Sequence, residues 1–234
     1  MQQIGTLGGT FDPIHRGHLL IAETAQAQLQ LDQILWVPAP HPPHKSGQQP
    51  EPLLAFEHRL EMVRRAIAAY PGFALPALPE LDAPTARVSY AIETLRALQE
   101  LYPLARWYWI IGLDAFQTLP FWKDRRSLAQ SCCWVVAPRI APLVPPPGSA
   151  QIYQQAEAVC QTVAQQLAAE AISLRWQILE MQPLQISSRL IRSRCRQQQP
   201  IDAMVPAAVR DYIQRHNLYR ELIPGSPDEA RPLG

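Results

Sequence analysis

The chain has 234 residues, 47% of them hydrophobic and 18% charged, with a formal net charge of +1. These values are typical of a globular protein that buries a core of ordinary size, and they argue against a surface dedicated to polyanions. No apolar run reaches the roughly 18 residues of a membrane-spanning helix, and the N-terminus lacks a signal-peptide pattern. Four cysteines without CxxC spacing predict free thiols, so we expect a cytoplasmic protein that binds neither nucleic acid nor membrane.

The N-terminal third alternates between strand-like and helix-like patterns. Residues 3–7 are short and apolar and stop at Gly8-Gly9, which predicts a strand entering a tight turn. Residues 18–29 carry apolar side chains at helical spacing, and residues 34–37 form a second apolar run closed by a proline. Strand, glycine turn, helix and strand make one βαβ unit, which implies a parallel sheet.

The alternation continues along the rest of the chain, which indicates an α/β fold with a small helical C-terminal part. The patterns predict helices at 56–67, 90–101, 152–167, 188–195 and 207–216, and strands at 107–111, 134–137 and 174–179. Only short extended pieces are expected over 71–87, and a proline-rich linker over 137–149. We expect one domain over residues 1–220 and a disordered tail over 222–234, which is rich in Pro, Gly and charge.

The stretch GGTFDPIHRGH, residues 8–18, is the first candidate site, and we call it the glycine corner. Ligands of open α/β sheets bind beyond the carboxyl ends of the strands, and Gly8-Gly9 follows the first predicted strand. Glycine lets a ligand approach the backbone, and the helix that Gly17 opens offers N–H groups to an anion. His15 and His18 would then donate hydrogen bonds to a phosphate.

Spacing alone does not restrict the glycine corner to phosphate binding. A Gly-Gly turn precedes many helices, and one of the two histidines could simply cap the helix. His41 and His44 repeat the three-residue spacing of His15 and His18, so the four could in principle hold zinc. No cysteine or carboxylate joins either pair, which argues against that metal site.

The string GGTFDPIHRGHL closely resembles GGTFDPxHxGHL, the signature of the HxGH nucleotidyltransferases and in particular of the bacterial nicotinate-mononucleotide adenylyltransferase family. Further matches to this family follow in the same order: Pro42-Pro43-His44-Lys45, Ser89-Tyr90 with Thr94-Leu95, Ile110–Asp114 with Phe121-Trp122, Ile186-Ser187-Ser188 with Ile191-Arg192, and Val205-Pro206 through Leu218-Tyr219. The resemblance spans about residues 1–220. It implies a Rossmann-like parallel sheet flanked by helices.

The resemblance implies that AMP is transferred from ATP, with Mg²⁺, to nicotinate mononucleotide, giving deamido-NAD and pyrophosphate in NAD biosynthesis. The phosphate of the mononucleotide attacks the α-phosphorus of ATP, and it needs no general base because its second pKa is about 6. Fixed positive groups must instead hold the charge of two polyanions. This requirement fits a sequence with no Ser-His-Asp set and no obvious carboxylate pair.

The resemblance also implies the role of individual residues, and none is implied as a metal ligand. The implied catalytic residues are His15, His18, Lys45 and Arg192. The implied ATP-binding residues are Gly8, Gly9, Thr10, Phe11, His15, His18, Gly112, Asp114, Ile186, Ser187, Ser188 and Arg192. The implied nicotinate mononucleotide-binding residues are Lys45, Tyr90, Ala91, Trp122 and Lys123, with main-chain N–H groups near 90–91 and 122–123 holding the carboxylate.

Each of these side chains could also have an ordinary structural role. Lys45 could be a solvated loop lysine, Ser188 a helix cap without a ligand, Asp114 another helix cap, and Trp122 a core residue. Arg192 could belong to a solvated basic face with its neighbouring arginines.

Several positions depart from the family pattern and keep two other functions open. Arg189 replaces a small hydroxyl residue, Ala91 replaces threonine, PELDAPTARV blurs the usual acidic residues and R-x-G, and Pro138-Arg139 departs from the family's RPG. The alternatives are a related adenylyltransferase with another substrate and a nucleotide-binding paralogue without catalysis. The intact histidines and Arg192 argue against the paralogue. No pattern in the sequence indicates an oligomeric state.

Overall fold

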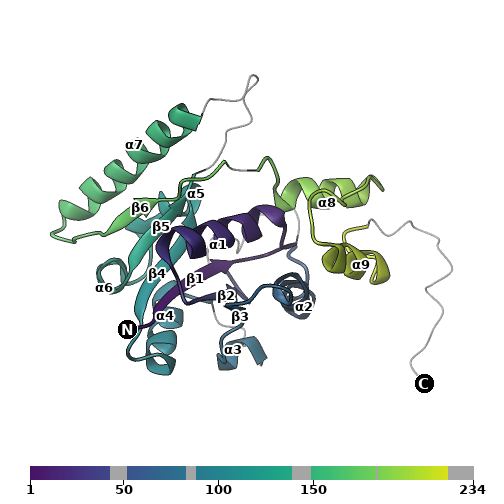
Figure 1. The fold of residues 1–234 in the computed structure, drawn as a ribbon, viewed down its shortest axis with the longest axis horizontal. Helices are drawn as coiled ribbons and strands as arrows, with labels where there is room; N and C mark the ends of the chain where they lie inside the picture. The colour runs from purple at the N-terminus through teal and green to yellow at the C-terminus, as the bar shows by residue number, and fades with distance from the viewer. Residues whose placement is uncertain (43–51, 83–87, 139–148, 183, 221–234) are drawn as a thin grey trace.

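The structure is a computed structural model that describes residues 1–42, 52–82, 88–138, 149–182 and 184–220 (Figure 1). Within these residues the strands are β1 (Gln3–Gly9), β2 (Gln33–Pro38), β3 (Phe73–Ala74), β4 (Arg106–Gly112), β5 (Cys133–Ala137) and β6 (Trp176–Ile178). They form one parallel sheet in the order β3-β2-β1-β4-β5-β6. The predicted α/β fold with a parallel sheet is confirmed.

The strand order reverses between β1 and β4, which lie side by side at the centre of the sheet. Open α/β sheets bind ligands beyond the carboxyl ends of the strands at such a reversal. β1 ends at Gly9 and β4 ends at Gly112, so both glycines that follow predicted strands come to this edge. The topology therefore favours a ligand site at the glycine corner.

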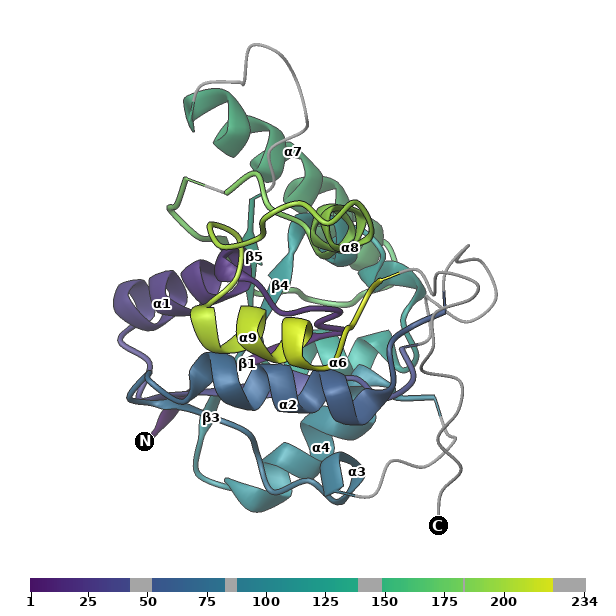
Figure 2. The ribbon, with the colours of Figure 1, turned by 90° about the vertical axis from the view of Figure 1, so that its right-hand side faces the viewer.

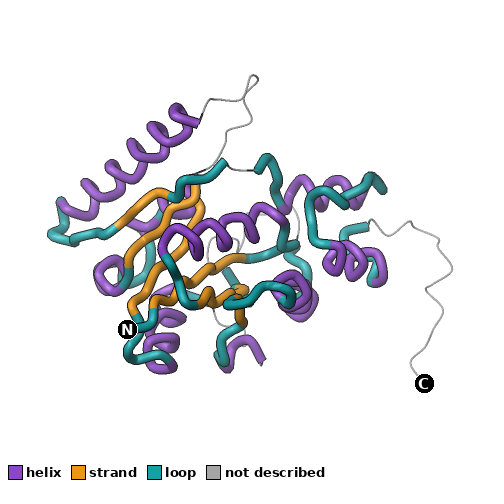
Figure 3. Tube along the Cα trace, viewed as in Figure 1, coloured by secondary structure: helices purple, strands orange, loops and turns teal. Residues whose placement is uncertain are grey.

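Helices flank both faces of the sheet (Figures 1 and 3). One face packs against α1 (Arg16–Leu29), α8 (Ser188–Arg196), α9 (Ala207–Arg215) and most of α2 (Phe56–Ile67). The other packs against α3 (Pro79–Asp82), α4 (Ala91–Leu101), α5 (Leu113–Phe116), α6 (Arg125–Ser131) and α7 (Ser149–Ala168), with the 3₁₀ helix η2 (Leu119–Phe121) nearby. No helix in the described part of the chain is long and apolar enough to cross a membrane.

Two apolar cores lie on the two faces because successive side chains of a strand point to opposite sides. In β4, Tyr108 and Ile110 belong to the core under α1, whereas Trp107, Trp109 and Ile111 belong to the core under α4. Burial on both faces explains why the strands appear in the sequence as continuous apolar runs rather than alternating ones.

The small helical C-terminal part lies beside the N-terminal half of the fold, with α9 alongside α2 (Figure 2). Tyr212 of α9 is buried, and its Oη lies 2.9 Å from Nδ1 of His58 in α2. Beyond α9, Oη of Tyr219 donates to Oδ1 of Asp12 at 2.7 Å, which brings the last described segment of the chain to the glycine corner. The predicted tail at 222–234, residues 139–148 of the predicted proline-rich linker at 137–149, and Lys45 lie outside the described residues.

Candidate active site

A cavity of 480 Å³ opens at the carboxyl ends of β1, β2 and β4. Its walls include the glycine corner, the end of β2 and the residues after it, the start of α4, and the segment from α5 to Lys123. The predicted site residues that line it are Gly8, Gly9, Thr10, Tyr90, Ala91, Asp114, Trp122 and Lys123. Four residues expected to touch ATP therefore share one cavity with four residues expected to touch the mononucleotide, whereas His15, His18 and Arg192 are not among its lining residues.

Phe11 packs inside the glycine corner and does not line the cavity. Its φ of 49° is in the left-handed region, and its side chain is 2% exposed. A Cβ atom on Gly9 would lie only 2.8 Å from Cζ of Phe11, so the ring needs a glycine at that position. The Phe11 ring also meets the His18 ring edge to face, with centroids 5.1 Å apart. The buried Phe11 ring thus helps to hold the His18 ring in position.

His15 and His18 stack at the start of α1, with ring centroids 3.7 Å apart and planes at 21°. His15 is 7% exposed, and this burial lowers its pKa to about 4, so its ring is neutral near pH 7. A Cβ atom on Gly17 would lie 3.0 Å from Nδ1 of His15, so glycine leaves room for that ring.

His18 has a defined tautomer when neutral. The main-chain N–H of His15 donates to Nδ1 of His18 at 3.2 Å. Because Nδ1 accepts this bond, the proton of the neutral ring sits on Nε2. His18 is only half-buried, so Nε2 is the atom that can donate to a phosphate oxygen.

Residues 186–192, which we call the C-terminal signature, contact the glycine corner through two side-chain hydrogen bonds. Oγ of Ser188 donates to the main-chain oxygen of Pro13 at 2.9 Å, and Nη1 of Arg192 donates to that of Asp12 at 2.8 Å. The N-cap of α8 is Ser187, whose Oγ accepts from Leu190 N–H at 3.2 Å, and not Ser188. Residues more than 170 positions apart in the sequence therefore meet at the corner.

Other residues of the C-terminal signature do not reach this contact. Ile186 is half-buried against the core under α1. The side chain of Arg189, which departs from the family pattern, is exposed at the surface of α8.

Trp122 and Lys123 form the far wall of the cavity. Nε1 of Trp122 donates to Oγ1 of Thr118 at 2.8 Å, which fixes the indole ring. Nζ of Lys123 lies 2.7 Å from Oε1 of Glu93 and 4.1 Å from the centroid of the Tyr90 ring. An ion pair and a cation–π contact thus hold the Lys123 side chain at the edge of the cavity.

Existing main-chain hydrogen bonds limit which N–H groups of this wall can donate to a carboxylate. Ala91 opens α4, so its N–H is among the first four that have no intrahelical partner. The N–H of Trp122 already donates to the main-chain oxygen of Leu119 at 3.0 Å, within the turn of η2. The expected main-chain donors are therefore reduced to those near Ala91 and Lys123.

Gly112 and Asp114 mark the carboxyl end of β4. Gly112 is the N-cap of α5, and a Cβ atom there would meet nothing within 4 Å, so packing does not require a glycine. Asp114 lies in the first turn of α5, is exposed and lines the cavity. Its carboxylate therefore belongs to the cavity wall rather than to the core.

A buried arginine, Arg59, contacts several loops around the cavity, and no sequence motif identifies it. Arg59 of α2 is 1% exposed. Its guanidinium donates to four main-chain oxygens at 2.8–3.0 Å, those of Leu54, Thr10, Ala39 and Pro40. Burial lowers the pKa of Arg59, and the nearby Asp12 carboxylate opposes that shift. The one signal in the sequence is an arginine on the apolar stripe of a helix.

Two predicted features lie partly or wholly outside the described residues. Lys45, expected to contact both substrates, lies outside them, as does His44 of the four-histidine zinc alternative. Within the described residues, no group of three or more His, Cys, Asp and Glu side chains could hold a metal ion.

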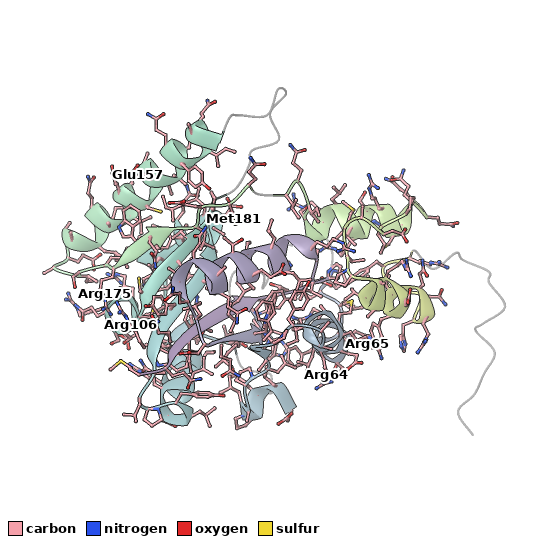
Figure 4. All side chains as sticks on the ribbon, in the orientation of Figure 1. Arg64, Arg65, Arg106, Glu157, Arg175 and Met181 are labelled. Atoms are coloured by element: carbon pink, nitrogen blue, oxygen red, sulfur yellow. The ribbon has the colours of Figure 1, made fainter. Side chains whose placement is uncertain are left out.

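Another hollow, of 520 Å³, lies at the opposite edge of the sheet and is lined by Arg106 and Arg175 among others. Figure 4 labels these two arginines. These arginines stand at the amino ends of β4 and β6, where α/β sheets do not place their ligands. We therefore assign the candidate site to the cavity beside the glycine corner.

Comparisons with known proteins bear on this site. A family model described as cytidylyltransferase-like matches residues 6–194. A protein of Trichormus variabilis named "Probable nicotinate-nucleotide adenylyltransferase" is 42% identical over 221 residues, covering 94% of this chain and 99% of that protein. A protein of the same name from a Synechococcus species is 42% identical over 218 residues, covering 93% of this chain and 97% of that protein.

Among solved structures, the Plasmodium falciparum nicotinic acid mononucleotide adenylyltransferase complexed with NaAD matches with a TM-score of 0.67. It is 19% identical, and the match covers 94% of this chain and 98% of that chain. At this identity the match supports the fold alone. It confirms the Rossmann-like arrangement expected from the sequence.

Proposed function

Because the chain belongs to the cytidylyltransferase-like family, we propose that it transfers AMP from ATP to nicotinate mononucleotide, forming deamido-NAD and pyrophosphate. Relatives that match nearly the whole chain carry this activity in their names. The observation that carries the proposal is the single cavity at the carboxyl ends of β1 and β4, which joins the glycine corner to Tyr90 and Trp122. One end suits a polyphosphate and the other suits an aromatic ring.

The proposed phosphate end uses the glycine corner. The 5′-phosphate of the mononucleotide attacks the α-phosphorus of ATP, and the bond to the β-phosphate oxygen breaks. The attacking phosphate is already ionised, so no side chain has to remove a proton. His18 donates from Nε2 to an oxygen of the α-phosphate, where negative charge builds up in the transition state. The N–H groups at the start of α1 add positive potential.

ATP enters this reaction as a complex with a divalent ion, for which we propose Mg²⁺. The described side chains form no cluster able to hold an ion by themselves. Mg²⁺ is usually bound through substrate phosphates and water, with few protein ligands. The ion therefore belongs to the substrate, and the chain acts on the polyphosphate through hydrogen bonds and positive charge.

The proposed base end uses the wall formed by Trp122 and the start of α4. The indole, held by Thr118, stacks on the pyridine ring. The nicotinate carboxylate accepts hydrogen bonds from main-chain N–H groups near Ala91 and Lys123. An anion gains charge-assisted bonds from such donors, which a carboxamide does not. Nicotinate is therefore the preferred base.

The experiment is a panel of acceptors incubated with MgATP, with pyrophosphate release measured and the products identified by mass. The panel contains nicotinate mononucleotide, nicotinamide mononucleotide, phosphopantetheine and a pyrimidine nucleotide. We expect deamido-NAD as the dominant product. Turnover with another acceptor would reassign the substrate, and ATP binding without any turnover would identify a nucleotide-binding protein that lacks catalysis.

A further inference from the structure

Asp12 lies in the glycine corner with a carboxylate that is 2% exposed. Its Oδ1 accepts a hydrogen bond from Oη of Tyr219 at 2.7 Å, across 207 positions of sequence. Its Oδ2 lies 3.9 Å from Nη1 of Arg192, which donates instead to the main-chain oxygen of Asp12 at 2.8 Å. The carboxylate is thus held tightly by a phenol and loosely by a guanidinium.

The geometry of this trio has an electrostatic consequence. A carboxylate and a guanidinium at hydrogen-bond distance frequently form a bidentate pair, whose charge-assisted bonds are about twice as strong as neutral ones. Such a pair is strengthened further where water is excluded. A close Asp12–Arg192 pair would compete with a polyphosphate for this guanidinium. Burial raises the pKa of Tyr219, and the charge of Asp12 raises it further, so the phenol keeps its proton and stays a donor.

We propose that Tyr219 is a positioning residue, which holds the Asp12 carboxylate through Oδ1 and so keeps it from pairing closely with Arg192. The guanidinium of Arg192 then binds the polyphosphate of ATP. This inference rests on the proposed function in one respect, namely that a polyphosphate is the ligand of the glycine corner.

The alternative is that Tyr219 only anchors the segment after α9. The two roles differ in whether the charge of Asp12 matters. If Tyr219 restrains that charge, removing its hydroxyl harms polyphosphate binding only while Asp12 is ionised. If Tyr219 is only an anchor, the loss is the same whether or not Asp12 carries a charge.

The test is a double-mutant cycle with Tyr219→Phe and Asp12→Asn in the full chain. Binding of tripolyphosphate and of MgATP is measured by calorimetry, with the KM for ATP and the melting temperature alongside. We expect Tyr219→Phe alone to weaken both ligands by about tenfold, the effect of one charge-assisted contact. In the Asp12→Asn background, Tyr219→Phe should change binding by less than about twofold.

A matched control is Tyr108→Phe. Oη of Tyr108 donates to Oε1 of Gln3 at 2.8 Å, a tyrosine hydrogen bond of similar length to a neutral acceptor, toward the amino ends of β1 and β4. This variant should lower the melting temperature like Tyr219→Phe while leaving the binding of both ligands unchanged.

Three outcomes would overturn the inference: unchanged binding in Tyr219→Phe, an equal loss in both Asp12 backgrounds, or weaker binding in Asp12→Asn alone. Weaker binding in Asp12→Asn alone would overturn the inference even if Tyr219→Phe fails to fold. Tripolyphosphate carries no base or acceptor, so its binding pattern is independent of the proposed substrate. If no mononucleotide reacts but the cycle behaves as described, the proposed function fails and this inference stands.

Discussion

His15 and His18 are adjacent in space but differ in what they can do. His15 is buried and neutral, whereas His18 is half-buried, with Nδ1 accepting a main-chain bond and Nε2 carrying the proton of the neutral ring. The sequence motif predicts both residues at the corner. It does not distinguish their roles, because the difference depends on the burial of His15 in the fold and on a single main-chain hydrogen bond to His18.

Replacing His18 by alanine should lower kcat by at least about a hundredfold, because a donor to the transition state is typically worth about 3 kcal/mol. His18→Gln keeps an N–H at similar reach and should recover part of the rate. Steady-state kinetics and thermal unfolding would be measured together. A folded His18→Ala variant with wild-type turnover would remove His18 from the mechanism.

His15 should make the stability of the protein depend on pH. Burial lowers its pKa in the folded state to about 4, while the unfolded chain has the ordinary value near 6.5. Between these values the unfolded state binds a proton that the folded state does not, so stability falls as pH drops from 6.5 toward 4. This difference in the pKa of His15 corresponds to at most about 3 kcal/mol in the free energy of unfolding.

Urea unfolding of the wild type and of His15→Gln at pH 7, 6 and 5 measures this contribution. The free energy of unfolding should fall less steeply with acid in the variant, because glutamine does not titrate in this range. Parallel profiles for the two proteins would mean that His15 ionises as easily in the fold as in the unfolded chain.

At the scale of elements, the periodicity of the sequence predicts the long helices and the buried strands. Helix α7 spans 20 residues, and β4 is an unbroken apolar and aromatic run, so their patterns are clear. The one-turn elements α3, α5 and η2 are too short to show a period of 3.6 residues. Helix α6 starts after Asp124, whose left-handed φ of 48° accompanies an ion pair with Arg96.

Helix α2 shows why the contacts around the cavity could not be predicted in full. Its apolar stripe is visible in the sequence, but Arg59 occupies a buried position on it. The partners of Arg59 are main-chain oxygens of three separate loop segments, and oxygens of this kind are present at every residue. Only the folded chain specifies which ones are used.

Arg59→Met should destabilise the protein by at least about 3 kcal/mol, because buried carbonyl groups would lose their donor at a cost of roughly 1–3 kcal/mol each. The control is Arg64→Met on the same helix (Figure 4). The Arg64 side chain is 58% exposed and pairs with Glu61. An exposed pair of this kind is worth less than about 1 kcal/mol. Equal losses in urea unfolding would show that Arg59 does not hold the loops.

At the scale of the whole molecule, the glycine corner is a meeting point of both ends of the described chain. The segment after β1 supplies Asp12 and Pro13, while α8 and the segment after α9 bring Ser188, Arg192 and Tyr219 to them. The motifs indicate that each segment matters, but the contacts between them depend on how α8 and α9 pack against the sheet. The sequence therefore predicts which segments form the site better than it predicts their hydrogen bonds.

The proposed function depends most on one selectivity, that the cavity prefers a carboxylate on the pyridine ring to a carboxamide. The most direct measurement is a competition in one tube, with equal concentrations of nicotinate and nicotinamide mononucleotides, limiting MgATP and early sampling. The ratio of deamido-NAD to NAD then equals the ratio of the two kcat/KM values. We predict a ratio of at least about 100, or about 3 kcal/mol, from charge-assisted main-chain hydrogen bonds. A ratio near one, or an excess of NAD, would contradict the proposed preference for nicotinate.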